Sequence, residues 1–166
     1  MNNYASIPSS NRVTSRFTLG SEIEPEVALL LHSNYLHCAE LAGIEPCDLE
    51  SHILNGNCVV WRQFPREDIG FCGIFIGDVY MVSHICIANQ RDRYNYLLDL
   101  LYTSTPVVFA VPIHLAKQLQ RLGYRMLPNP IPMYFRGEWI DKYVCLNHSV
   151  TNEDISMLIQ HYMENF

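Results

Sequence analysis

Apolar residues recur at helical spacing in five stretches of the chain. The first begins at Pro25, which suits the first position of a helix, and ends at Gly43, which suits the position after the last helical residue. A break at Ile44-Glu45-Pro46 separates it from the second pattern. The remaining helices are expected over residues 48–54, 91–102, 112–122 and 151–165.

Runs of β-branched and aromatic residues lie between these helices. Residues 58–64, 69–76 and 79–88 are separated only by the turns at 65–68 and 77–78, which predicts a three-stranded antiparallel meander. Residues 107–111 are apolar on both faces and indicate a buried central strand. Residues 126–132 carry three prolines and read as a loop or an interrupted strand, and further strands are expected over 133–135 and 143–146.

The order of these elements predicts an α/β fold, with a mixed sheet of the α+β kind flanked by helices and followed by an extra C-terminal helix. We expect three segments: a polar arm over residues 1–15, a domain over 16–146 and the helix within 147–166. The arm is expected to be flexible or ordered by a partner. In the last helix, Thr151 suits the N-cap, with Asp154 three residues later. Its apolar face can dock on the domain or on a partner, and we favour the domain.

Composition narrows the function. A chain of 166 residues that is 49% hydrophobic is most simply one globular domain. The net charge of −6 makes nucleic acid an unlikely partner, although Arg62, Arg66, Arg91 and Arg93 leave a local basic patch open. No apolar run approaches the roughly 20 residues of a membrane span, and residues 1–15 lack the apolar middle of a signal peptide, so we expect no membrane span and no secretion.

The six cysteines form no C-x-x-C pair and lie mostly in apolar runs, which favours buried reduced thiols. No two of the seven histidines stand four residues apart, so no metal site is predicted. Strict alternation puts Val82, His84 and Cys86 on one side of their strand. His84 and Cys86 would then lie about 7 Å apart, too far for direct activation, and a cysteine nucleophile is not expected.

The junction after the strand at 79–88 is the most informative feature. In α/β proteins of this layout an anionic cofactor binds there, on the bare amides at the start of the next helix. This chain has no glycine at the junction; side chains occupy the turn instead, at Gln90, Arg91, Asp92, Arg93 and Tyr94. The backbone therefore cannot approach a pyrophosphate as closely as a glycine turn permits.

Residues 79–93 and 107–124 together resemble the acyl-CoA strand and loop, and the following strand and helix, of the GNAT acyltransferase family. The resemblance spans about residues 16–146 and implies a GNAT-like fold. In active members the loop resembles Arg/Gln-x-x-Gly-x-Gly/Ala, and its amides bind the pyrophosphate. Here Gln90 or Arg91 can fill the first position, but residues 93–96 leave the glycine positions unfilled, and Ile113-His114 stands where those enzymes often place an asparagine.

A second resemblance is to small GNAT-like internal virion or ejection proteins of short-tailed phages. It rests on the phrase Ala42-Gly43-Ile44-Glu45-Pro46 at the end of the first helix, and on the order of the later elements. It implies a protein of the virion, or of the host cytoplasm during assembly. Its partners would be other virion or assembly proteins, or further copies of itself, and it needs no reaction and no cofactor.

Our interpretation is therefore a catalytically degenerate GNAT-like protein that acts through protein contacts. The alternative is an active acetyl-CoA-dependent N-acetyltransferase. In that case His84 or Glu67 is the base, Tyr124, Tyr134 or Cys86 the acid, and the cofactor contacts are Gln90, Arg91, Arg93 and Tyr94. A second alternative is an inhibitor of a host defence complex that binds through its acidic surface.

Large aromatic residues outside a regular pattern and the apolar face of the last helix are the expected contact elements. The interface candidates are Tyr134, Phe135, Trp139, Ile155, Leu158 and Tyr162.

Overall fold

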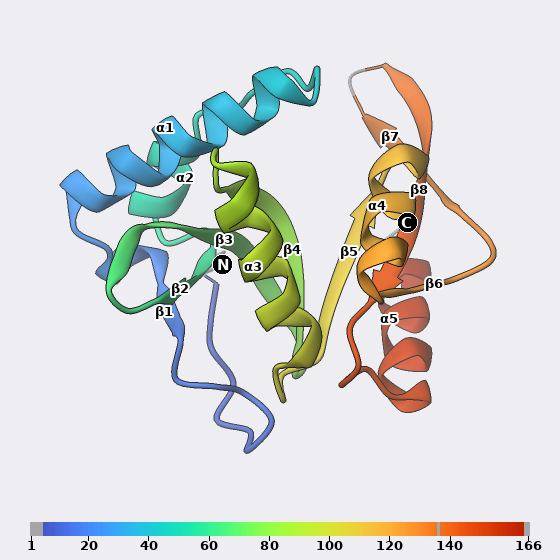
Figure 1. Ribbon diagram of the computed structural model, residues 1–166. Helices are drawn as coiled ribbons and strands as arrows, with labels where there is room; N and C mark the ends of the chain where they lie inside the picture. Colours follow the sequence, from blue (N-terminus) through green and yellow to red (C-terminus); the bar gives the residue numbers. More distant parts are fainter. Residues whose placement is uncertain (1–4, 136, 165–166) are drawn as a thin grey trace.

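The computed structural model describes residues 5–135 and 137–164, which form one mixed β-sheet with helices on both faces (Figure 1). The strands are β1 (Phe17–Leu19), β2 (Val59–Gln63), β3 (Arg66–Ile76), β4 (Val79–Cys86), β5 (Val107–Val111), β6 (Arg125–Met126), β7 (Ile131–Phe135) and β8 (Glu138–Leu146). The helices are η1 (Gly20–Glu22), α1 (Pro25–Leu41), α2 (Leu49–Leu54), α3 (Gln90–Tyr102), α4 (Ile113–Leu122) and α5 (Asn152–Glu164). The mixed α/β architecture predicted from the sequence is confirmed.

The strand order is β1-β2-β3-β4-β5-β8-β6. Neighbours from β1 to β4 run antiparallel, as the predicted meander requires, whereas β4 and β5 run parallel. The second half of β8 lies between β5 and β6, and its first half pairs with β7 in a ribbon that leaves the main sheet. The β8 strand thus starts at Glu138, five residues before the start predicted from the sequence.

Helices α3 and α4 cover one face of the sheet. Their buried side chains pack on the inward-facing residues of β2 to β5, and aromatic rings fill the centre of this core. The ring centroids of Trp61 and Tyr96 lie 5.6 Å apart and those of Phe109 and Tyr124 lie 5.4 Å apart, both pairs edge to face. Apolar residues buried on both faces explain why residues 107–111 form a central strand.

Two separate groups of helices cover the opposite face. Helices α1 and α2 pack over β2, β3 and β4, and α1 buries Ala28, Leu31, Tyr35 and Ala39 at the three- and four-residue spacing of one helical stripe. Gly43 follows α1 with a φ of +67°, so the predicted glycine stop is confirmed.

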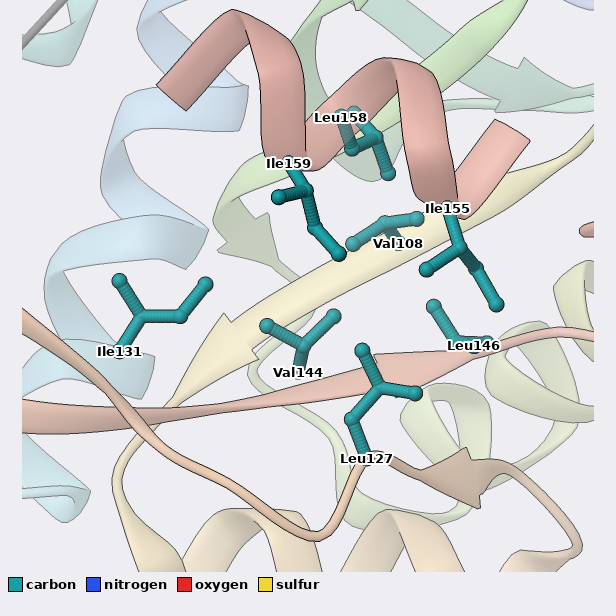
Figure 2. A pocket seen from close by; sticks show the side chains of 8 residues that line it. All are labelled: Val108, Leu127, Ile131, Val144, Leu146, Ile155, Leu158 and Ile159. Atoms are coloured by element: carbon teal, nitrogen blue, oxygen red, sulfur yellow. The ribbon is translucent and has the colours of Figure 1, made fainter. Parts of the chain in front are cut away.

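Helix α5 packs over β5 and β8 on that same face. Thr151 Oγ1 accepts from the Asp154 amide at 3.2 Å, and the Asp154 carboxylate accepts from the Thr151 amide at 2.9 Å, which confirms the predicted cap. Figure 2 shows Ile155, Leu158 and Ile159 pointing from α5 toward Val108 and Val144, around a cavity of about 20 Å³. The helix therefore docks on its own domain, the alternative we favoured.

The N-terminal arm packs on the domain over residues 5–15. Ala5, Ile7 and Val13 contact the core under α3 and α4, and the Ala5 amide donates to the Gly56 carbonyl at 2.9 Å. Arg12 forms a bidentate ion pair with Asp154 of α5. The prediction of a flexible or partner-ordered arm is wrong for residues 5–15, because their apolar side chains pack on the core of the domain.

The β4 strand does not keep a single alternation. Cys72 pairs with His84 and Gly73 with Val82, so Ser83 is the extra residue of a β-bulge. Val82 packs in the core under α3, whereas Cys86 packs in the core under α1. The predicted placement of Val82, His84 and Cys86 on one side of the strand is therefore wrong, because the bulge turns the second half of β4 over.

Within residues 5–135 and 137–164, no helix combines the length and the apolar character needed to cross a bilayer.

Candidate functional site

The β4 and β5 strands separate after a short paired stretch, and a cleft opens between them. Tyr80, Met81 and Val82 pair with residues 107–109, and no further pairing joins the described parts of the two strands. Beyond the last pair, a cleft of about 380 Å³ lies between α3 and α4. This volume is within the usual range for small-molecule sites.

The lining of the cleft is apolar at its base and polar at its rim. Apolar side chains come from β4, α3, β5 and α4: Ile85, Leu97, Phe109, Val111, Leu115, Leu119 and Leu122. The polar side chains are Gln90, Arg93, Tyr94, Gln118 and Arg121. Among the described residues, this lining contains no carboxylate, no imidazole and no thiol, the groups that most often serve as a general base.

At the start of α3, where an acyl-CoA pyrophosphate would bind, the amides of Asp92 and Arg93 already have acceptors. Asn89 is the N-cap, and its side-chain oxygen accepts from the Asp92 amide at 3.0 Å. The Arg93 amide donates to the Asn89 carbonyl at 2.9 Å. Asp92 adds a carboxylate to the first turn, 3.6 Å from Arg66. A pyrophosphate would have to displace the cap and approach that negative charge, so these residues do not fit the cofactor's amide cradle.

The four residues predicted to contact a cofactor lie around this helix start. Gln90, Arg93 and Tyr94 line the cleft, whereas Arg91 is exposed outside its lining. The Arg93 guanidinium is already engaged, because it donates to the Ile87 carbonyl at 3.1 Å and to Cys38 Sγ of α1 at 3.8 Å.

The three residues predicted to catalyse are not brought together. Tyr124 is buried and its hydroxyl donates to the Leu97 carbonyl at 2.6 Å. Burial raises the pKa of Tyr124 far above its usual range, so the phenol keeps its proton as a structural donor. Glu67 is exposed on β3, and His84 lies on the opposite face of the sheet from the cleft.

His84 belongs to a cluster under α1 and α2. Its Nε2 lies 3.5 Å from Cys47 Sγ and its Nδ1 lies 2.6 Å from Ser83 Oγ. The ring centroid of His84 is 5.2 Å from that of Tyr35 and 5.8 Å from that of His52. Burial lowers the pKa of His84 to about 4, with a smaller contribution from His52.

Sequence reasoning did not name Cys47 as a functional candidate. It precedes His84 by 37 residues and reaches it only because α1 and α2 pack on β4. The break at 44–46 marked the loop that carries Cys47, but no spacing rule connects a loop cysteine with a strand histidine.

Among the described residues, no group of three or more histidine, cysteine, aspartate or glutamate side chains is arranged to hold a metal ion.

The candidate interface residues divide into two groups. Tyr134 and Trp139 are 61% and 68% exposed at the end of the β7–β8 ribbon, with ring centroids 5.4 Å apart. Ile155 and Leu158 instead pack against β5 and β8 of their own sheet and are not available to a partner in this structure. The side chains of Phe135 and Tyr162 lie outside the described part of the structure.

The comparisons with known proteins bear on the fold. The chain is similar in structure to a putative acetyltransferase of the GNAT family from Bacteroides thetaiotaomicron, with a TM-score of 0.59 over 91% of this chain and 97% of that one. The sequences are 16% identical, so the similarity shows a GNAT-like fold and no more. No protein-family model matches the chain, and no curated protein matches it.

Proposed function

We propose that this protein is a GNAT-like domain that acts by contacting other proteins and does not transfer an acetyl group from acetyl-CoA. The observation that carries the proposal is the start of α3, where Asn89 caps the Asp92 amide and the Asp92 carboxylate stands in the first turn. A helix start without glycine, with its own cap and a negative charge, disfavours a pyrophosphate.

The surroundings of the cleft support the same proposal. A transferase needs a base for the amine and an acid for the leaving thiolate. The described lining of the cleft supplies no base, and the buried hydroxyl of Tyr124 is held by the Leu97 carbonyl. His84, one of the two base candidates by sequence, lies on the other face of the sheet because of the bulge at Ser83.

Two exposed apolar surfaces are suited to protein contacts. One is the aromatic pair of the ribbon, Tyr134 and Trp139. The other is the outer face of α1, where large apolar side chains are exposed: Leu29 at 54%, Leu30 at 49% and Leu41 at 68%. Clustered apolar side chains of this kind mark interaction sites, and aromatic residues dominate the binding energy at such sites.

The resemblance of Ala42–Pro46 to small internal virion proteins of short-tailed phages supports a more specific role. On that basis the partners are other virion or assembly proteins, met in the host cytoplasm during assembly and retained in the particle. The exposed aromatic pair of the ribbon is the surface that we assign to this contact.

A second candidate is an acyl-CoA-dependent transferase, and the cleft favours it. Its volume of about 380 Å³, its apolar base and the cations Arg93 and Arg121 suit a long ligand with an anionic end. Such a ligand would be bound by guanidinium groups instead of backbone amides.

Calorimetric titration of the purified chain with acetyl-CoA separates the two candidates. We expect no heat of binding up to millimolar cofactor. Saturable binding in the micromolar range, weakened by Arg121→Ala and unaffected by Lys117→Ala on the same helix, would overturn the proposal in favour of the transferase.

Chemical crosslinking of the protein in assembling or purified particles tests the contact role. Trp139→Ala is expected to abolish crosslinks to a particle protein, whereas Phe64→Ala, a change at a 93% exposed ring on the β2–β3 turn, leaves them unchanged. Equal crosslinking of both variants would exclude the ribbon as the contact surface.

A further inference from the structure

Cys47 stands apart from the other cysteines. It is exposed, Cys38 is half-buried, and the other four (Cys58, Cys72, Cys86 and Cys145) are buried. It also lies beside an imidazole, with its Sγ 3.5 Å from His84 Nε2. Reactive thiols sit in partly exposed places with a base in reach, whereas buried thiols are inert.

Ser83 links His84 to the neighbouring strand. Its hydroxyl oxygen lies 3.2 Å from the Cys72 carbonyl and 2.6 Å from His84 Nδ1. When the hydroxyl donates to the carbonyl, its oxygen accepts from Nδ1–H, and the lone pair of Nε2 then faces the Cys47 thiol. This is the tautomer in which Nε2 can accept the thiol proton. Ser83 acts as a positioning residue for the imidazole.

Tyr35 contacts the same sulfur. Its hydroxyl donates to Cys47 Sγ at 3.7 Å and accepts from the Cys47 amide at 3.2 Å. Burial raises the pKa of Tyr35, so the phenol remains a donor while negative charge develops on the sulfur. The thiol thus has a proton acceptor on one side and a hydrogen-bond donor on the other.

We propose that Cys47, with His84 as its base, is a nucleophilic thiol that forms mixed disulfides with small disulfides. The Cys47 proton passes to His84 Nε2 as the sulfur attacks one sulfur of the disulfide. The S–S bond breaks with its electron pair on the leaving sulfur, and that thiolate takes the proton from His84. Cys47 is oxidised to the mixed disulfide, and one small thiol is released.

The surroundings favour a sulfur electrophile over an acyl carbon. Attack on a carbonyl builds an oxyanion that needs hydrogen-bond donors, whereas attack on a disulfide leaves the charge on sulfur. The Cys47 amide already donates to the Tyr35 hydroxyl. This inference uses the opposite face of β4 from the cleft and does not depend on whether acetyl-CoA binds.

The test is the reaction of the reduced full chain with oxidised glutathione, followed by intact mass and peptide mapping. We expect a single adduct, on Cys47, before any other thiol reacts, and none in Cys47→Ser. His84→Asn is expected to slow the reaction by about threefold to tenfold, less than the ~10² typical of general bases, because the pKa of His84 is lowered to about 4, well below the working pH. The matched control is His52→Asn, which changes a neighbouring ring that the sulfur does not contact.

The pH dependence separates a base from a structural role. The titratable groups around His84 are Cys47, Tyr35 and His52. In strongly alkaline solution hydroxide removes thiol protons without help from a side chain, so the rates of wild type, His84→Asn and Ser83→Ala should converge there.

If His84→Asn does not fold, its buried thiols become exposed and the chain gives several adducts. Tyr35→Phe is then used instead of His84→Asn, and it is expected to slow the reaction while keeping a single adduct. Equal rates for Cys38 and Cys47, or wild-type rates in both His84→Asn and Tyr35→Phe, would overturn the proposal.

Discussion

The two faces of the sheet differ in chemistry where β4 ends. On the face of α3 and α4 there is a cleft of useful size, but its lining holds no described base. On the face of α1 and α2, a thiol, an imidazole, a hydroxyl and a phenol meet within hydrogen-bond distance. The shape expected of an acyl-CoA site and the groups able to move a proton thus lie on opposite sides of one strand.

The bulge at Ser83 is the cause of this separation. It turns His84 toward α1 and leaves Ile85 to line the cleft. One extra residue in a strand therefore decides which face receives the titratable side chain. The difference illustrates that a fold and the chemistry placed on it vary independently.

The largest expected effect concerns the closed end of the cleft, which the buried side chain of Asn147 holds together. Its oxygen accepts from the Val107 amide at 2.9 Å, and its nitrogen donates to the Leu100 and Thr105 carbonyls at 2.8 and 2.9 Å. Asn147→Ala leaves these backbone groups without partners and should lower the free energy of unfolding by about 3 kcal/mol or more.

Urea denaturation measures the loss from Asn147→Ala. The exposed Asn152→Ala on α5 is the control and should stay within about 0.5 kcal/mol of wild type. A loss below about 1 kcal/mol for Asn147→Ala would show that another contact fixes the connection between α3 and β5.

The next effect concerns the thiol face and its response to acid. The pKa of His84 is lowered to about 4 by burial, so between pH 6.5 and 4 the unfolded chain binds a proton that the folded chain does not. Stability is therefore complete above pH 6.5 and falls as the pH drops toward 4, by at most about 3 kcal/mol from this group.

Unfolding midpoints across this range test the acid response. His84→Asn should flatten the slope between pH 6.5 and 4. His52→Asn should flatten it less, because burial also lowers the pKa of His52 but to a smaller extent. An unchanged slope in His84→Asn would mean that the folded and unfolded chains protonate this imidazole over the same pH range, which contradicts its burial under α1 and α2.

A smaller effect tests the assignment of Tyr124 as a structural donor on the cleft face. Tyr124→Phe removes the hydrogen bond to the Leu97 carbonyl and should cost about 1 kcal/mol. Urea denaturation measures this, with Tyr102→Phe, a change at a 67% exposed ring, as the control. If Tyr124→Phe causes no loss of stability, the hydrogen bond to the Leu97 carbonyl does not hold the hydroxyl, and the phenol is available as a catalytic acid.

The smallest effect concerns the cap of α3. Asn89→Ala removes the side chain that accepts from the Asp92 amide and should cost about 1 kcal/mol, whereas Asn89→Gly should cost only a few tenths. If both variants lose an equal and negligible amount of unfolding free energy, the Asn89 side chain does not cap α3 in solution.

Local signals were enough to predict most of the fold. Pro25 and Gly43 bounded α1, Thr151 and Asp154 marked the start of α5, and the alternating runs before and after Gly77 gave the β3–β4 hairpin. At the junction after β4, the helix starts at Gln90 with Asn89 as its cap, close to the predicted start, while the inability of this junction to bind a cofactor stays a prediction. Each of these rests on residues close together in the sequence.

The features that were missed depend on contacts between distant segments. The bulge at Ser83 leaves no mark in the alternation of β4, and the pairing of Cys47 with His84 follows from how α1 and α2 pack on the sheet. The same reason applies to the arm, which Arg12 ties to Asp154 across more than a hundred residues. Periodicity describes one element at a time and cannot place such contacts.

The most direct test of the central claim follows the backbone amides of residues 90–94 by ¹H–¹⁵N NMR during titration with acetyl-CoA. Because the cap and the carboxylate of Asp92 occupy the start of α3, we predict no change in these resonances up to millimolar cofactor. Saturable shifts centred on these amides, with a dissociation constant in the micromolar range, would contradict the account.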